Sequence, residues 1–220
     1  MNTDTWVIVP GFNEETYIDT VLLKIGKETS NIIYVDDGSS DQSVFIAKKR
    51  AKHVLAHQTN LGKGAALKTG CEFAFETLQA KAVIFMDADD QHDPKEIPKF
   101  IFELTRYDMV FGVRKLDAAM PVLKFLQNKG ASILLNLLYG GYIPDIPSGY
   151  KAMTKKGYQK VRWKSPGYEV ETEIAMRVAK EKVSFTTIDI ETIYHDSDKG
   201  MTMLDALHIC SCLIQWRLGI

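Results

Sequence analysis

Short apolar runs alternate with segments of helical periodicity along the first half of the chain. The run Trp6–Pro10 is apolar and ends at Gly11, and the next apolar residues recur every three or four positions over 14–27. A second apolar run, Ile32–Val35, ends in turn residues that can cap a helix. The same criteria predict strands at 6–10, 32–35, 53–56, 82–86 and 108–112, each followed by a helix except the last. This alternation predicts an α/β fold, with a mostly parallel central sheet flanked by helices on both faces.

The pattern changes after Arg114. Helical periodicity is found over 123–138, 169–180 and 203–218, a Gly- and Pro-containing loop over 140–149, and a β-rich stretch over 183–194. No repeat, low-complexity tract or linker separates the two halves, so we predict that the second half elaborates a single domain.

The last predicted helix is apolar enough to allow two interpretations. Along one side it carries Met203, Leu207, Cys210, Ile214 and Leu218. Packing of that side into the core is the simpler interpretation. The alternative is contact with a membrane surface, with the segment 120–142 as its companion.

The charges of the chain are nearly balanced. The 220 residues include 27 Lys and Arg against 28 Asp and Glu, a formal net charge of -1. A global basic field that would hold nucleic acid is therefore missing, and an anionic ligand must be bound by local charge. The three Cys and the lack of an apolar leader favour a reducing cytoplasm, and no apolar run approaches the roughly 20 residues that span a bilayer. We expect a cytoplasmic protein that is soluble or peripheral at the inner face of the membrane.

Carboxylates follow two of the predicted strands directly. Asp36 and Asp37 come after one strand, and Asp87, Asp89 and Gln91 come after another. A single Asp here commonly turns the chain or caps a helix, but ligands of open α/β sheets bind at this edge. In an extended segment Asp87, Asp89 and Gln91 would point the same way, and the two carboxylates would repel unless a cation lay between them. Hard oxygen ligands suit Mg2+ or Mn2+, whose shell is commonly completed by phosphate, so we predict a diphosphate substrate.

Two familiar phosphate-binding patterns are absent. The segment 11–15 after the first strand is not a G-x-G-x-x-G turn. Gly62-Lys63-Gly64 lacks the earlier Gly and the following Ser or Thr of a P-loop. Taken alone, Lys63 is equally consistent with a solvated and a functional side chain.

Several segments, taken in order, carry a family resemblance. They are 7–15, 35–41, 60–64 and 87–94, then 112–114, 145–151, 167–173 and, more weakly, 194–199. Together they resemble the family 2 glycosyltransferases of GT-A fold, most closely the branch that transfers mannose to dolichyl or polyprenyl phosphate. The resemblance implies one glycosyltransferase domain over 1–220, with a nucleotide-sugar-binding half (1–114) and an acceptor-binding half (115–220) that ends in an amphipathic helix.

The resemblance also implies the roles of individual residues. Asp87, Asp89 and Gln91 are similar to the D-x-D-x-Q element that holds a Mg2+ or Mn2+ ion and the donor diphosphate, with Asp89 as a catalytic residue. Arg114 and Lys129 fall near positions where relatives bind the acceptor phosphate, and are the other expected catalytic residues.

The resemblance implies further contacts to the nucleotide-diphosphate sugar. Lys151 stands where an Arg is usual, and the two are not equivalent for bidentate phosphate binding. Lys199 resembles the Lys of a late donor-binding loop, although its neighbours depart from the family pattern. Besides Asp87, the expected donor-binding residues are Pro10, Phe12, Glu14, Asp37, Lys63, Lys151 and Lys199.

The acceptor decides whether a general base is needed. A phosphate monoester is largely dianionic at neutral pH and needs cations rather than a base. A saccharide hydroxyl needs a carboxylate base, for which Asp145, Glu171 and Glu173 are candidates, although we interpret Glu171 as a capping or surface acid. The resemblance implies an inverting hexosyltransferase that moves mannose or glucose to a polyprenyl phosphate, which needs no general base. The alternatives are a saccharide acceptor and a non-catalytic nucleotide-sugar-binding module.

Overall fold

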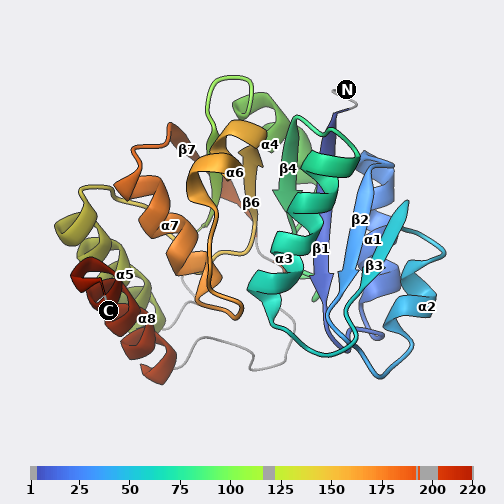
Figure 1. Ribbon diagram of the computed structural model, residues 1–220, viewed down its shortest axis with the longest axis horizontal. Helices are drawn as coiled ribbons and strands as arrows, with labels where there is room; N and C mark the ends of the chain where they lie inside the picture. The colour runs from blue at the N-terminus through green and yellow to red at the C-terminus, as the bar shows by residue number, and fades with distance from the viewer. Residues whose placement is uncertain (1–3, 116–121, 192, 194–202, 220) are drawn as a thin grey trace.

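One mixed sheet organises the part of the chain that the structure describes. The computed structural model describes residues 4–115, 122–191, 193 and 203–219. Within these ranges seven strands form a sheet in the order β3-β2-β1-β4-β6-β5-β7 (Figure 1). The strands are β1 (Thr5–Gly11), β2 (Ile32–Asp36), β3 (His53–Ala56), β4 (Ala82–Phe85), β5 (Met109–Arg114), β6 (Lys151–Thr154) and β7 (Phe185–Ile190). The predicted α/β fold with a mostly parallel sheet is confirmed.

Strand β6 is the exception to the parallel arrangement, and it was not predicted. It runs antiparallel to both of its neighbours, with Lys151 opposite Phe85 of β4 and Phe111 of β5. The other pairings in this sheet are parallel. The sequence pattern misses β6 because the strand has four residues and begins with a lysine. Its direction brings its first residue to the edge where the parallel strands end.

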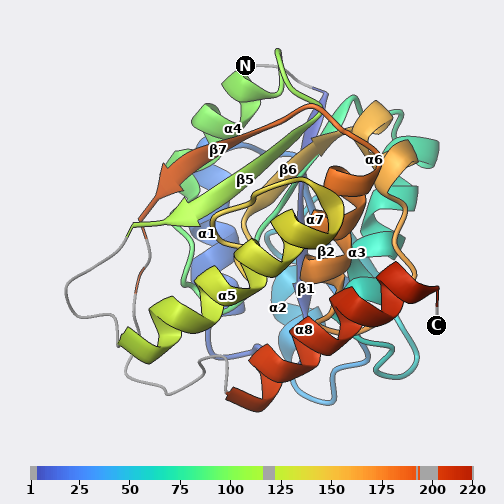
Figure 2. The same cartoon turned by 90° about the vertical axis from the view of Figure 1, so that its left-hand side faces the viewer.

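Helices cover both faces of the sheet. They are α1 (Ile18–Glu28), α2 (Ser43–Ala47), α3 (Lys63–Glu72), α4 (Ile97–Glu103), α5 (Val122–Tyr139), α6 (Lys155–Val161), α7 (Val170–Lys180) and α8 (Met203–Leu218), with a π-helical turn after α3 and a 3-10 turn before α4. Helices α1, α2 and α4 pack on the face that carries Val7 and Val9, while α3, α6 and α7 pack on the face that carries Ile8. Helices α5 and α8 lie side by side in an outer layer against α7 (Figure 2).

The orientation of α8 differs from the core-packing interpretation. The side chains that enter the core are Cys212 and Leu213, with Trp216 packed against them. Leu207, Ile214 and Leu218, from the side assigned to the core, are instead exposed. Both sides of this helix are apolar, so periodicity does not decide which side faces inward. Within the described residues, no helix is both long and apolar enough to cross a membrane.

Candidate active site

The carboxyl ends of β1, β2 and β4 form one edge of the sheet, and the predicted acids lie there. The loop that precedes β6 closes the same edge, because Gly149 lies against Asp87. A Cβ atom added at Gly149 would come within 2.2 Å of Asp87 Oδ2. A side chain at residue 149 would therefore displace the carboxylate of Asp87, on which the loop 145–149 directly lies.

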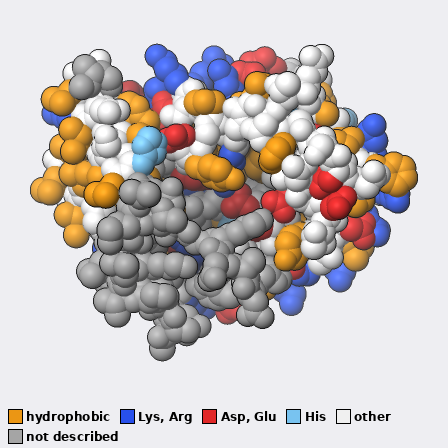
Figure 3. Space-filling model, turned by 90° about the horizontal axis from the view of Figure 1, so that it is seen from below, with side chains coloured by type: hydrophobic (Ala, Val, Ile, Leu, Met, Phe, Trp, Pro, Cys, Tyr) orange, Lys and Arg blue, Asp and Glu red, His pale blue; other side chains and the backbone are white. Residues whose placement is uncertain are grey.

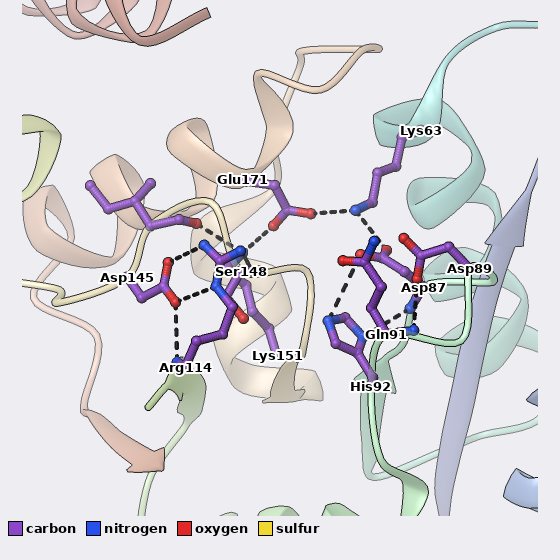
Figure 4. Close-up of polar contacts among 11 residues, drawn as sticks. Lys63, Asp87, Asp89, Gln91, His92, Arg114, Asp145, Ser148, Lys151 and Glu171 are labelled. Carbon is purple, nitrogen blue, oxygen red and sulfur yellow. Dashed lines mark hydrogen bonds and ion pairs between the residues drawn. The ribbon is translucent and has the colours of Figure 1, made fainter. Parts of the chain in front are cut away.

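The segment after β4 turns instead of staying extended. Asp90 has a φ of 63°, in the left-handed region, and the backbone N–H of Gln91 donates to Asp89 Oδ1 at 3.1 Å. The expectation that alternation would align Asp87, Asp89 and Gln91 is thus wrong in its geometry. The turn nevertheless brings the three together in Figure 4. Burial and the nearby charge of Asp87 raise the pKa of the Asp89 carboxyl, so the two acids repel.

Asp87 is held as a carboxylate by its neighbours. Lys63 Nζ lies 2.7 Å from Asp87 Oδ1, and the backbone N–H of Asp87 donates to His92 Nδ1 at 3.2 Å. Burial alone would raise the pKa of Asp87, but the positive charge of Lys63, with His92, lowers it to about 2. Asp87 is therefore ionised at neutral pH and available to a cation.

Glu171 links Lys63 to a second lysine, as Figure 4 shows. Its Oε1 lies 3.0 Å from Lys63 Nζ, and its Oε2 accepts from Lys151 Nζ. Our interpretation of Glu171 as a capping or surface acid is wrong: the residue lies in the first turn of α7, but it is only 5% exposed. In the sequence Glu171 is an acid next to the apolar Val170, and this neighbour alone is too weak a signal to predict that Glu171 is buried or which residues it contacts.

Lys151 is the most enclosed charged group of the site. Its side chain has no exposed surface, and its Nζ donates to the carbonyl oxygens of Ile146, at 3.2 Å, and Ser148 as well as to Glu171. Burial lowers the pKa of Lys151, against the opposing effect of Glu171. In this structure the ammonium thus supports the loop that precedes β6, and the expected direct contact of Lys151 with the donor stays a prediction.

The two cations assigned to the acceptor lie on different elements. Arg114, at the end of β5, forms a bidentate pair with Asp145, with both N–O distances at 2.8 Å, and its backbone N–H donates to the same carboxylate at 3.1 Å. Lys129 lies on α5, where its Nζ is 3.2 Å from the hydroxyl of Tyr142. The structure thus anchors Arg114 beside the loop 145–149.

The residues expected at the nucleotide differ in burial and in hydrogen bonding. Asp37 accepts hydrogen bonds from the backbone N–H groups of Leu61, at 2.9 Å, and Gly62, at 2.7 Å, and lies 2.7 Å from His57 Nδ1. Its carboxylate therefore fixes the loop before α3. Pro10 is buried and Phe12 is exposed at the end of β1.

Glu14 and Lys199 complete the predicted donor set. The backbone N–H of Glu14 donates to the hydroxyl of Ser43 at 2.9 Å, which ties the loop after β1 to α2. Lys199 lies outside the described residues.

The donor atoms present fit a hard divalent cation. Asp87 and Asp89 repel each other, and Gln91 adds an amide oxygen beside them. Among the described residues, no group of three or more His, Cys, Asp or Glu side chains could hold a metal. Two carboxylates and an amide are the donor set of an ion that completes its shell with water and phosphate.

A family comparison identifies the chain. The description "Glycosyl transferase family 2" matches residues 6–162. The chain belongs to family 2 of the glycosyltransferases. It is therefore an enzyme that transfers a sugar, as the motifs predicted.

Individual relatives cover nearly the whole of this family 2 chain. An uncharacterized protein of Methanocaldococcus jannaschii is 34% identical over 98% of this chain and 93% of its own length. The UDP-N-acetylglucosamine–dolichyl-phosphate N-acetylglucosaminyltransferase of Methanococcus voltae is 29% identical over 97% of this chain and 96% of its own. The crystal structure of glucosyl-3-phosphoglycerate synthase from Mycobacterium tuberculosis, in complex with Mn2+, UDP and its product, has a TM-score of 0.72 at 20% identity, over 98% of this chain and 80% of its own. The fold is thus shared with a GT-A enzyme.

Proposed function

We propose that this glycosyltransferase moves a hexose, mannose or glucose, from a nucleotide-diphosphate sugar to a polyprenyl phosphate, with inversion and with a divalent cation. One observation carries the proposal: the loop 145–149 contacts both the cation assigned to the acceptor and a carboxylate assigned to the metal. At one end Asp145 binds Arg114, and at the other end Gly149 lies against Asp87. A cation that can bind an acceptor phosphate is thereby tied to the carboxylates that can hold a donor diphosphate.

The reaction breaks the bond between the anomeric carbon and the diphosphate oxygen. Negative charge then develops on the leaving diphosphate and positive charge on the anomeric carbon. An oxygen of the acceptor phosphate attacks this carbon from the opposite face and forms the new C–O bond, which inverts the anomeric configuration. A cation held by Asp87, Asp89 and Gln91 would supply Lewis-acid stabilisation of the leaving group. Lys63, next to Asp87, adds a positive charge of the protein on the same side.

A phosphate acceptor agrees with the state of the carboxylates nearby. Its oxygen is already ionised and needs positive charge, a role that we assign to Arg114 and Lys129. The three candidate bases already have positively charged partners: Asp145 pairs with Arg114, Glu171 with Lys63 and Lys151, and Glu173 with Arg177. The Methanococcus voltae relative, which is named for dolichyl phosphate, supports the same acceptor class.

Product formation tests the proposal. The purified protein is incubated with GDP-mannose, UDP-glucose or UDP-N-acetylglucosamine and a short polyprenyl phosphate, with Mn2+, Mg2+ or a chelator. We expect a lipid-linked monosaccharide only with a divalent ion, and a loss of about 100-fold in Asp89→Asn. The surface variant Asp19→Asn is the matched control and should keep its activity. Activity that survives chelation would refute the metal assignment.

The same assay separates the two alternatives. Transfer to a saccharide but not to the polyprenyl phosphate would indicate a hydroxyl acceptor, and a loss of kcat in a folded Glu173→Gln or Asp145→Asn protein that is larger at neutral pH than at high pH would indicate a general base. Donor binding without turnover on any acceptor would indicate a binding module.

A further inference from the structure

Lys63 is a protein cation in contact with two carboxylates from different elements. Its Nζ lies 2.7 Å from Asp87 Oδ1, after β4, and 3.0 Å from Glu171 Oε1, on α7. The side chain is 15% exposed, and the two carboxylates outweigh the effect of burial and raise the pKa of Lys63 above its usual value. The charge opposite Asp87 is thus supplied by the protein itself.

The backbone around Lys63 is fixed, so movement is confined to its side chain. A Cβ atom added at Gly64 would lie 2.2 Å from the carbonyl oxygen of Ser165. The carbonyl oxygen of Gly64 accepts a hydrogen bond from Trp163 Nε1 at 2.8 Å, and the N–H of Ala65 donates to Pro166. The flexible four-carbon side chain of Lys63 can therefore change partners while its Cα stays in place.

The two carboxylates that contact Lys63 differ in what else they can bind. Asp87 is one of the two repelling acids of the proposed metal site, and it is more exposed than Glu171. The other carboxylate oxygen of Glu171 is bound by the fully buried Lys151, which fixes the side chain of Glu171. A divalent cation at Asp87 would be repelled by an ammonium in contact with the same carboxylate. Glu171, in contrast, can keep its lysine.

We propose that Lys63 is the resident counter-cation of Asp87 in the donor-free enzyme and leaves Asp87 when a divalent cation and the diphosphate bind. Glu171 retains the ammonium during this exchange, so that it faces the diphosphate as a second positive charge. The inference rests on the proposed function, because it takes the site of Asp87 and Asp89 as the place where the metal binds. Glu171 acts here as a positioning residue for Lys63.

Binding of Mn2+ in the absence of nucleotide tests the exchange. In Lys63→Met the competing charge is gone, so Mn2+ alone should bind about tenfold more tightly than to the wild type, measured by electron paramagnetic resonance of the free ion. With Mn2+ present, UDP or GDP should bind about tenfold more weakly, measured by calorimetry, because a positive charge facing the diphosphate is lost. Lys68→Met, an exposed position on the same helix, should change neither value.

A second variant should change the Mn2+ affinity in the opposite direction. Glu171→Gln removes a negative charge and leaves Asp87 as the partner of Lys63, so Mn2+ alone should bind several-fold more weakly. Circular dichroism verifies that each variant is folded, and Lys63→Gln replaces Lys63→Met if the latter does not fold. Unchanged or weaker Mn2+ binding in the folded Lys63 variant would overturn the exchange and indicate a permanent structural ion pair. A wild-type protein that binds no Mn2+, with or without a nucleoside diphosphate, would instead refute the metal of the proposed function.

Discussion

At the scale of single residues, the site depends on a lysine that solvent does not reach. Lys151 is surrounded by Glu171 and by the carbonyl oxygens of Ile146 and Ser148. A buried ion pair costs desolvation energy when it forms, but removal of one partner leaves an uncompensated charge. Lys151 therefore matters for stability as well as for the shape of the loop 145–149.

We predict that Lys151→Met lowers the free energy of unfolding by about 3 kcal/mol. Urea denaturation followed by fluorescence measures the change. The double variant Lys151→Met with Glu171→Leu should recover part of the loss, because the buried carboxylate that has lost its lysine is then removed as well. Lys156→Met removes a lysine that is 70% exposed, and should stay within about 0.5 kcal/mol of the wild type. A Lys151→Met protein as stable as this control would contradict the prediction.

The sequence predicted some of these residues better than others. Asp87 and Asp89 could be found because they follow a strongly apolar strand, where ligands of such sheets bind. Their contacts could not, because the turn at Asp90 and the partners Lys63 and Glu171 depend on segments far apart in the chain. Glu171 looked like an ordinary acid in a first helical turn, and only the packing of α7 shows that it is buried.

At the scale of elements, α7 holds the loop that follows α6. Glu173, in the first turn of α7, accepts from the backbone N–H groups of Lys164 and Ser165, at 2.9 and 2.7 Å, and from Arg177 at 2.7 Å. The same loop contacts Gly64 at the start of α3. Glu173 thus supports the backbone next to Lys63.

This arrangement predicts a dependence of stability on pH. Burial opposes ionisation of Glu173, but the hydrogen bonds from Ser165, Lys164 and Arg177 lower its pKa below the usual 4.5. Because the pKa of Glu173 is lower in the folded than in the unfolded protein, its ionisation stabilises the fold when the pH is above the pKa of the unfolded protein. This contribution is lost as the pH falls through the pKa of the folded protein. Glu173→Gln should therefore cost about 2 kcal/mol at neutral pH, and its difference from the wild type should shrink between about pH 5 and pH 3.

Urea denaturation across this pH range measures that difference. Glu181→Gln, at the exposed end of the same helix, is the control and should follow the wild type throughout. A difference for Glu173→Gln that is constant with pH would show that its ionisation plays no part.

The elements themselves were predicted where the pattern is long or strongly apolar. Helices α5, α7 and α8 match the expected 123–138, 169–180 and 203–218 within one or two residues. Strand β6 was missed because Lys151–Thr154 is short and starts with a charge that tertiary contacts neutralise. Helix α2 is short, since it ends at Ala47 and the chain turns before Ala51.

At the scale of the whole molecule, α5 and α8 present apolar side chains outward. Leu137 is 75% exposed on α5, and Leu218 is 68% exposed on α8. Figure 3 shows hydrophobic side chains gathered at the side of the molecule where these two helices lie. Among the side chains that the structure describes on these two helices, Ile133, Leu207 and Ile214 are exposed as well. Such a surface favours the membrane-contact interpretation of α8, which suits the lipid acceptor that we propose.

We predict that this surface binds lipid vesicles. The wild type should sediment with vesicles of phosphatidylcholine and phosphatidylglycerol, and Leu137→Lys combined with Leu218→Lys should reduce the bound fraction at least about fivefold, because two apolar side chains no longer enter the lipid. Phe45→Lys changes a side chain that is 59% exposed on α2, and should bind like the wild type. Equal sedimentation of the double variant would exclude this surface as the contact.

The antiparallel strand β6 has a consequence for the order in which the molecule can be completed during synthesis. Strand β5 has β6 and β7 as its neighbours, and β6 alone joins it to β4. When the ribosome has released the chain only through Arg114, β5 exists without the strand that connects it to the rest of the sheet. The first four strands can pair as they emerge, but Arg114 reaches its place beside Asp145 only after about 40 more residues have left the exit tunnel, once β6 has inserted. The pair of Arg114 and Asp145 is therefore assembled late, after the strands that carry Asp37 and Asp87 at their ends have paired.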